Sequence, residues 1–208
     1  MTRMIILAAC MALAGCGLGS RLLGGGGTDT ETVSFAGSVC GDPMLKGEVI
    51  GAVPGRIPGC GIDEAVQITS VAGVGLSQPS LMDCPTAMAL KDWTENSVKP
   101  AMSSLGRLAS YRVAAHYVCK TRNSQPGAKI SEHGKGRAID ISAFNMQDGT
   151  VVTVLTGWGD RRTGKALREV HKGACGPFGT VLGPDSDRFH QGHFHLDTAR
   201  YRGGPYCR

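Results

Sequence analysis

Histidine and aspartate side chains that can bind a metal ion gather in two short segments of the second half of the chain. His133 and Asp140 lie in residues 131–140, which read S-E-H-G-K-G-R-A-I-D, and His193 and His195 lie in an H-F-H triplet. Two imidazoles and one carboxylate leave the fourth position of a tetrahedral zinc ion open to water, as in catalytic zinc sites. Zinc lowers the pKa of that water towards neutrality. The residue types therefore indicate metal-assisted hydrolysis.

Non-haem Fe(II) oxygenases also hold their metal through two histidines and one carboxylate. Those enzymes favour a reducing cytosol and an H-x-D spacing, whereas seven positions separate His133 from Asp140 in this chain. The chain also has the features of an exported protein. Zinc is therefore the expected cofactor.

The first segment is expected to combine a strand with a sharp turn. Residues 138–144 read A-I-D-I-S-A-F and predict a strand, which projects Asp140 to one face of a sheet. Gly134 and Gly136 permit the tight path that brings His133 back towards the same face. The segment therefore predicts that His133 and Asp140 address one point.

The second segment is expected to be a strand over residues 192–197. Because side chains alternate along a strand, His193 and His195 share a face. His190 lies near the start of this segment and supplies a further imidazole. Glu132, as the neighbour of His133 in extended chain, is expected to point away from the site.

The remaining pattern predicts an α+β domain over residues 35–208. A small antiparallel sheet is expected to carry the metal site, flanked by helices and stabilised by disulfides. Residues 35–80 are rich in Gly and Pro and predict a covering layer of loops and short strands. The other expected elements are helices over residues 85–93, 98–108 and 164–174 and strands over residues 113–119, 151–155 and 180–182.

The N-terminal part is expected to direct the protein to the bacterial envelope. Residues 1–15 combine Arg3 with an apolar run too short to span a bilayer, which is typical of an export signal. The letters L-A-G before Cys16 resemble a lipobox, so acylated Cys16 is expected to anchor the protein in a lipid bilayer; the alternative is an ordinary secretory signal. Residues 16–34 predict a flexible Gly-rich tether. Gly17 is not the aspartate that often signals inner-membrane retention, which favours the periplasmic face of the outer membrane.

Six cysteines follow the tether, and an even number in an oxidising compartment indicates three disulfides. A structural zinc cluster is disfavoured because the sequence contains no C-x2-C pair. Six cysteines allow about fifteen pairings. Chain order alone favours pairing Cys40 with Cys60, Cys84 with Cys119, and Cys175 with Cys207.

The formal net charge of +5 is modest, and the lysines and arginines are scattered. Nucleic-acid binding is therefore not expected. The positive balance is compatible with an anionic partner such as a cell-wall polymer.

The motifs resemble those of known families. Residues 131–140 fit S-x-H-x2-G-x-A-x-D, and with the later H-x-H they resemble the metal motif of D-Ala-D-Ala peptidases, penicillin-insensitive murein endopeptidases, lysostaphin-type enzymes and the hedgehog domain. Three segments resemble the bacterial extensin-like C-terminal domain family more closely: S-E-H-x-x-G-x-A-I-D-I, A-C-x-x-F-x-x-V-L-G-P over residues 174–184, and H-F-H-L-D over residues 193–197. This resemblance covers roughly residues 40–208.

By position, the resemblance implies that His133, Asp140 and His195 are the zinc ligands. His193 would hydrogen-bond the reacting water or the transition state. The D-Ala-D-Ala peptidases carry a general-base glutamate three residues before the last ligand, where this chain has Gly192.

The murein endopeptidases instead use additional histidines, and the spacing H-x2-H-x-H from His190 resembles theirs. His193, with His190 as the second candidate, is therefore expected to take a proton from water, because an imidazole has a near-neutral pKa.

Further roles follow from the same resemblance and from position. Arg122 resembles the family's substrate or oxyanion arginine, and Ser131 is placed to hydrogen-bond a substrate carboxylate. Asp197, two positions beyond His195 on the same strand face, is expected to orient a histidine.

Together these features predict a zinc-dependent peptidase that acts on cross-link or stem-peptide amide bonds of peptidoglycan. The alternative is a zinc-containing lipoprotein of the same fold that binds the cell wall without catalysis. The absence of a glutamate at Gly192 favours the alternative.

Overall fold

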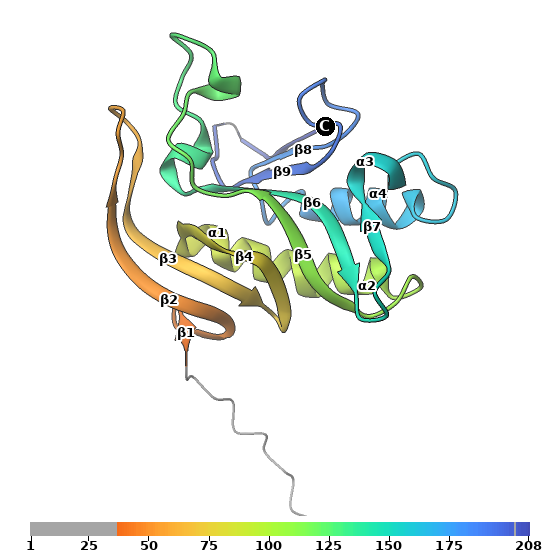
Figure 1. The fold of residues 1–208 in the computed structure, drawn as a ribbon. Helices are drawn as coiled ribbons and strands as arrows, with labels where there is room; N and C mark the ends of the chain where they lie inside the picture. The colour runs from red at the N-terminus through yellow and green to blue at the C-terminus, as the bar shows by residue number, and fades with distance from the viewer. Residues whose placement is uncertain (1–36, 202) are drawn as a thin grey trace, which may run out of the picture. The chain divides into compact units, whose positions relative to one another are not determined.

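One curved sheet with helices against it organises the protein, in a computed structural model that describes residues 37–201 and 203–208. Within these residues ten strands form the sheet in the order β1-β2-β3-β4-β5-β6-β9-β8-β10, with β7 paired to β6 (Figure 1). The strands are β1 (Ser38–Val39), β2 (Asp42–Pro54), β3 (Gly61–Val71), β4 (Val74–Asp83), β5 (Leu108–Ala115), β6 (Ala138–Met146), β7 (Val151–Thr153), β8 (Thr180–Leu182), β9 (Phe194–Asp197) and β10 (Tyr206–Cys207).

The helical segments of the described residues are fewer than the strands. They are α1 (Cys84–Trp93), the π-helical turn η1 (Thr94–Val98), α2 (Lys99–Met102), the short turns η2 (Arg122–Ser124) and η3 (Glu132–Lys135), α3 (Val154–Gly157) and α4 (Gly164–Ala174). Among the described residues, no helix combines the length and the apolar character needed to cross a bilayer. The predicted export signal over residues 1–15 and the predicted lipidated tether over residues 16–34 lie outside the described residues.

The first half of the domain corrects the prediction of a loop-rich covering layer. Residues 35–80 contain two of the three longest strands, β2 and β3, and most of β4, and these strands pair in antiparallel succession. The register of β2 against β3 shifts at several points, including one between Lys46 and Gly47. A side chain at Gly47 would lie 2.0 Å from the carbonyl oxygen of Gln67. The glycines that suggested loops therefore allow bulges inside long strands.

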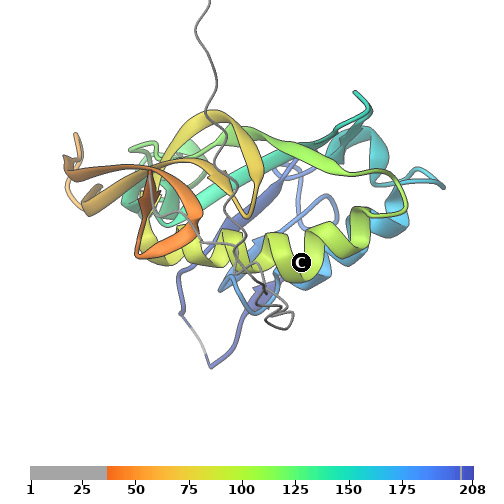
Figure 2. The ribbon, with the colours of Figure 1, turned by 90° about the horizontal axis from the view of Figure 1, so that it is seen from below.

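The helices pack on one face of the sheet, as Figure 2 shows. Asp83 caps α1 by accepting a hydrogen bond from the Thr86 backbone N–H at 2.9 Å, as N-terminal capping residues do. Trp93, at the end of α1, is fully buried and donates its indole N–H to the carbonyl of Val170 in α4 at 2.8 Å. The tryptophan therefore joins α1 to α4.

The predicted helices are confirmed in part. Helix α4 has the predicted bounds, whereas the helix predicted over residues 98–108 ends at Met102. Gly106 then adopts a φ of 135°, which only glycine tolerates easily, and the chain enters β5 at Leu108. The α+β class with disulfides is confirmed, but the sheet is larger than predicted and includes parallel pairings of β4 with β5 and of β8 with β10.

All six cysteines of the described residues form disulfides, but two of the pairings favoured by chain order are wrong. The observed pairs are Cys40–Cys84, Cys60–Cys119 and Cys175–Cys207. Cys40 precedes β2 and Cys60 follows it, so the length of this strand separates two cysteines that are neighbours in chain order. Only the Cys175–Cys207 pair agrees with chain order.

The disulfide pattern gives a direct test of the fold. Proteolysis of the unreduced protein followed by mass spectrometry is expected to yield linked peptides containing Cys40 with Cys84 and Cys60 with Cys119. A linked peptide containing Cys40 and Cys60 would contradict the arrangement of β2, β3 and α1.

Candidate metal centre

Three elements bring the predicted ligands together. Strands β6 and β9 pair in a register that sets Asp140 directly opposite His195. His133 lies in the turn η3, which ends at Gly136 in the left-handed region with φ 68°. A side chain at Gly136 would lie 2.3 Å from the Ile62 side chain. Glycine is therefore required there for both conformation and space, as the sequence indicated.

The three ligand atoms lie at hydrogen-bonding distances from one another. Asp140 Oδ1 is 3.1 Å from His133 Nε2 and 2.9 Å from His195 Nδ1, and the two imidazole nitrogens are 3.1 Å apart. All three residues are buried. The group is one that can hold a metal ion, as the sequence predicted.

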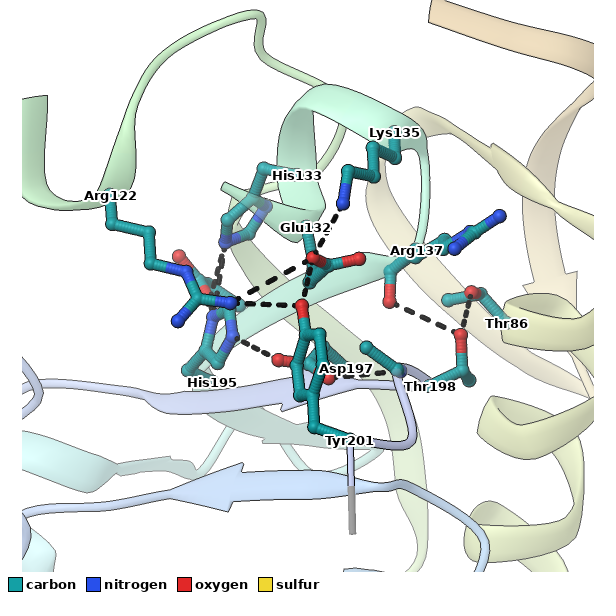
Figure 3. A network of polar contacts seen from close by, with 12 residues as sticks. Thr86, Arg122, Glu132, His133, Lys135, Arg137, His195, Asp197, Thr198 and Tyr201 are labelled. Carbon is teal, nitrogen blue, oxygen red and sulfur yellow. Dashed lines mark hydrogen bonds and ion pairs between the residues drawn. The ribbon is translucent and has the colours of Figure 1, made fainter. Parts of the chain in front are cut away.

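The outward-facing nitrogens of the two imidazoles are fixed as donors. His133 donates from Nδ1 to the backbone carbonyl of His116 at 2.8 Å, because a carbonyl oxygen can only accept. His195 donates from Nε2 to Asp197 Oδ2 at 3.1 Å, in the orienting role predicted for Asp197 (Figure 3). In the neutral rings His133 Nε2 and His195 Nδ1 therefore present lone pairs towards the Asp140 carboxylate.

A cation must lie among these three acceptors, since lone pairs so close repel one another. Without a metal ion, a proton takes this place. Burial lowers the pKa of His195, but hydrogen bonds to Asp140 and Asp197 outweigh burial and raise it to about 9. Burial raises the pKa of Asp140, but hydrogen bonds from His133 and His195 outweigh it and hold this pKa well below its usual range. A metal ion and a proton thus compete for one position.

Two further imidazoles lie beside the three ligands. His193 Nε2 is 3.5 Å from Asp140 Oδ2, and burial is the main cause that lowers the pKa of His193, so its ring is neutral near pH 7. His190 is buried and its Nδ1 is 2.8 Å from Asp187 Oδ1. The ring centroids of His190 and His193 are 5.3 Å apart. The structure therefore gathers both histidines predicted for proton transfer, and adds Asp187, which the sequence did not single out.

Glu132 corrects the prediction that its side chain points away. It is buried in the wall of the site, where its Oε1 accepts hydrogen bonds from the hydroxyl of Tyr201 and, at 3.0 Å, from Lys135 (Figure 3). Glu132 begins a 3-10 turn rather than extended chain, which reverses the expected direction. Burial and the hydrogen bond to Glu132 raise the pKa of Tyr201 to about 12.

Arg122 and Ser131, the residues predicted to bind substrate, lie in the same cavity as the three candidate ligands. Arg122 is half-exposed and donates to the Tyr201 hydroxyl at 2.9 Å, with its guanidinium 4.0 Å from Glu132. Ser131 is buried at the start of η3. Tyr201 lies four residues after Asp197 but belongs to none of the motifs, and its partner Glu132 is 69 residues away, so sequence reasoning did not single it out.

These residues line one cavity of about 750 Å³, within the range usual for ligand sites. The lining is polar, with leucine as its one aliphatic residue among those described. It comprises Lys120, Arg122, Asn123, Ser124, Lys129, Ser131, Glu132, His133, Asp140, Thr180, Leu182, Asp187, Phe189, His190, His193, His195, Asp197, Tyr201 and Tyr206. Each of the four carboxylates in it has a side-chain partner.

The donor set fits zinc. Two imidazole nitrogens, on rings that are each held by a further hydrogen bond, and one carboxylate oxygen form the three-ligand set of open zinc sites. Comparison with known proteins adds a family assignment: the family model described as extensin-like protein C-terminus matches residues 47–208. No curated protein and no solved structure matches.

Because a metal ion and a proton compete for one position, the affinity of the site for metal is expected to depend on pH. A proton must leave His195 before a metal ion binds, and this proton is held below a pKa of about 9. The apparent affinity for Zn²⁺ is therefore expected to rise with pH up to about 9, with release of about one proton per ion at neutral pH. Calorimetric titration in buffers of different ionisation enthalpy measures this release. An affinity that does not change with pH below 9 would contradict the arrangement.

Asp197→Asn tests the orienting hydrogen bond to His195. The substitution weakens the acceptor for His195 Nε2–H and is expected to lower Zn²⁺ affinity about 10- to 100-fold. Asp187→Asn is the matched control, because Asp187 contacts His190 and none of the three ligands. Equal affinities of the two variants in competition with a chelating dye would show that Asp197 does not act through His195.

Proposed function

The chain belongs to the extensin-like protein C-terminus family, and we propose that it is a zinc-dependent peptidase that cleaves cross-link or stem-peptide amide bonds of bacterial peptidoglycan. One observation carries the proposal: a buried set of three mutually facing acceptors opens into a cavity that also holds a neutral imidazole. A purely structural zinc site uses four protein ligands and has no need of an adjoining cavity.

When bound by His133, Asp140 and His195, zinc would supply Lewis acidity and lower the pKa of a water molecule. The residues around it perform the remaining steps. His193 is neutral near pH 7 and lies beside Asp140, so it can accept a proton from the attacking water and return it to the departing amine. Asp187 holds His190 in the same cavity as the second candidate for this role.

We assign proton transfer to an imidazole because each carboxylate in the described cavity already has a side-chain partner, although Glu132 Oε2 is buried without a hydrogen bond. Glu132 is held by Tyr201 and Lys135, and Asp187 by His190. Asp140 contacts the histidine ligands and Asp197 contacts His195. Gly192, at the position of the peptidase glutamate, has no side chain to contribute.

The cavity wall supplies groups for a substrate with free carboxylates. Arg122 is held in place by Tyr201, so its guanidinium loses little freedom when it binds an anion. Lys120 and Lys129 lie in the same lining. Stem peptides of peptidoglycan carry carboxylates, which suits this wall.

The proposal places the protein in the bacterial envelope, anchored through acylated Cys16 at the periplasmic face of the outer membrane. Three disulfides among the described residues support an oxidising compartment. The second candidate function is cell-wall binding without catalysis, with the metal serving structure. The engagement of every carboxylate in the described cavity favours this alternative, because the usual carboxylate base is missing.

Incubation of the zinc-loaded protein with purified murein separates the two functions. Wild type is expected to release new amino and carboxyl termini. His193→Ala is expected to retain one equivalent of zinc but to lose about 10²- to 10⁴-fold in rate, the usual contribution of a general base. His190→Ala measures the second candidate in the same assay.

The contrary outcome is also specific. If the zinc-loaded wild type releases no termini while both it and Asp140→Ala sediment with murein, the protein is a binding module and the peptidase proposal is wrong.

A further inference from the structure

Most aromatic side chains of the described residues belong to a core set or a cavity set, whereas Tyr117 and Trp158 are half-buried and belong to neither. The larger core set is fully buried and contains Trp93, Tyr111, Phe144, Phe178 and Phe194. The cavity set is Phe189, Tyr201 and Tyr206, which are 43%, 56% and 40% exposed and all line the metal cavity. Exposed aromatic rings gathered at one site are unusual on a protein surface and mark a binding site.

Each ring of this cavity set has an arginine over it. The guanidinium carbon of Arg122 lies 5.3 Å from the centre of the Tyr201 ring, as Figure 3 shows in part. The corresponding distances are 4.8 Å for Arg188 over Phe189 and 5.7 Å for Arg208 over Tyr206. All are within the range of cation–π contacts. The three rings therefore line one cavity, and a guanidinium lies against each of them; of the three arginines, Arg122 also lines the cavity.

The other lining residues indicate which apolar groups a ligand could place in this cavity. Leu182 is the one aliphatic side chain among the described lining residues, and most of the others are polar or charged. Long aliphatic groups, such as lipid chains, would find little to pack against, because ligand sites for such groups are mainly apolar. A sugar ring instead combines a flat C–H face, which packs on the electron-rich face of an aromatic ring, with hydroxyls that hydrogen-bond to polar side chains.

The charges select among sugars. Arg122, Lys120 and Lys129 line the cavity, and arginine forks bind carboxylates in bidentate geometry. The acidic side chains of the described lining are already engaged by histidines, Tyr201 or Lys135. Lys120, Arg122 and Lys129 are the cationic side chains that this wall offers to a ligand, and their complement is an anionic sugar.

We infer that Phe189, Tyr201 and Tyr206, with their stacked arginines, form a binding site for a glycan whose sugar rings carry carboxylates. The inference deepens the proposed function and rests on it for the location of the ligand, which lies beside the metal centre. The protein then recognises the glycan strand of its substrate and not the peptide alone. Two sources offer this chemistry: peptidoglycan strands with free lactyl carboxylates, and polyuronates.

Binding to defined glycans tests the inference without catalysis. The full chain is stripped of metal with a chelator, and its affinity is measured for peptide-free murein glycan strands, polygalacturonate and neutral chitooligosaccharides. At least one carboxylated glycan is expected to bind more tightly than the neutral one, and the tighter of the two identifies the source. Phe189→Ala and Tyr206→Ala are each expected to lower that affinity about three- to tenfold, the value of one aromatic contact.

Two variants control for general effects of substitution. Arg168 lies 5.8 Å over the Trp158 ring, the same kind of stack outside the cavity lining, so Arg168→Ala is expected to leave glycan affinity unchanged. Phe189→Tyr keeps a ring and is expected to keep the affinity, which separates loss of the ring from loss of folding.

Three results would overturn the inference: no binding of either carboxylated glycan, equal binding of the neutral one, or no effect of the two ring substitutions. Cleavage of murein without binding of peptide-free glycan would support the proposed function and contradict this inference. Binding of the glycan without cleavage of murein would support this inference and contradict the proposed peptidase activity.

Discussion

The site depends on one electrostatic constraint: three acceptor atoms face one another within hydrogen-bonding distance in a buried position. The outward nitrogens of His133 and His195 donate to the His116 carbonyl and to Asp197, so neither inward nitrogen carries a proton in a neutral ring. Asp140 adds a charged oxygen between them. The arrangement is stable only with a cation inside it, and a proton or a metal ion can be that cation.

The fold serves this constraint through a few long-range connections. The β6–β9 register sets Asp140 opposite His195, and Gly136 ends the turn that carries His133. A side chain at Gly134 would lie 3.0 Å from the sulfur of Cys60, so the Cys60–Cys119 disulfide packs directly against this turn. The long β2–β3 hairpin, which bears Cys60 next to β3, thus supports the metal centre from the side.

Local patterns in the sequence were enough to predict the elements that carry His133, Asp140 and His195, and the family resemblance singled out these three residues as the candidate ligands. Alternation predicted strands around Asp140 and His195, and helical spacing predicted α4. Features that depend on distant pairings were not predictable in this way. Glycines inside β2 resembled loop signals, two of the three disulfides join cysteines that are not neighbours in chain order, and Tyr201 contacts Glu132, 69 residues away. In each case tertiary contacts decided what local sequence left open.

The most direct test of the metal site is a crystal structure of the zinc-loaded protein, with anomalous data collected on both sides of the zinc absorption edge. The account predicts one strong zinc peak within about 2.0–2.2 Å of His133 Nε2, an Asp140 oxygen and His195 Nδ1. A zinc ion bound only elsewhere, or the three ligand atoms at the same separations with no cation among them in crystals grown above pH 9, would contradict it.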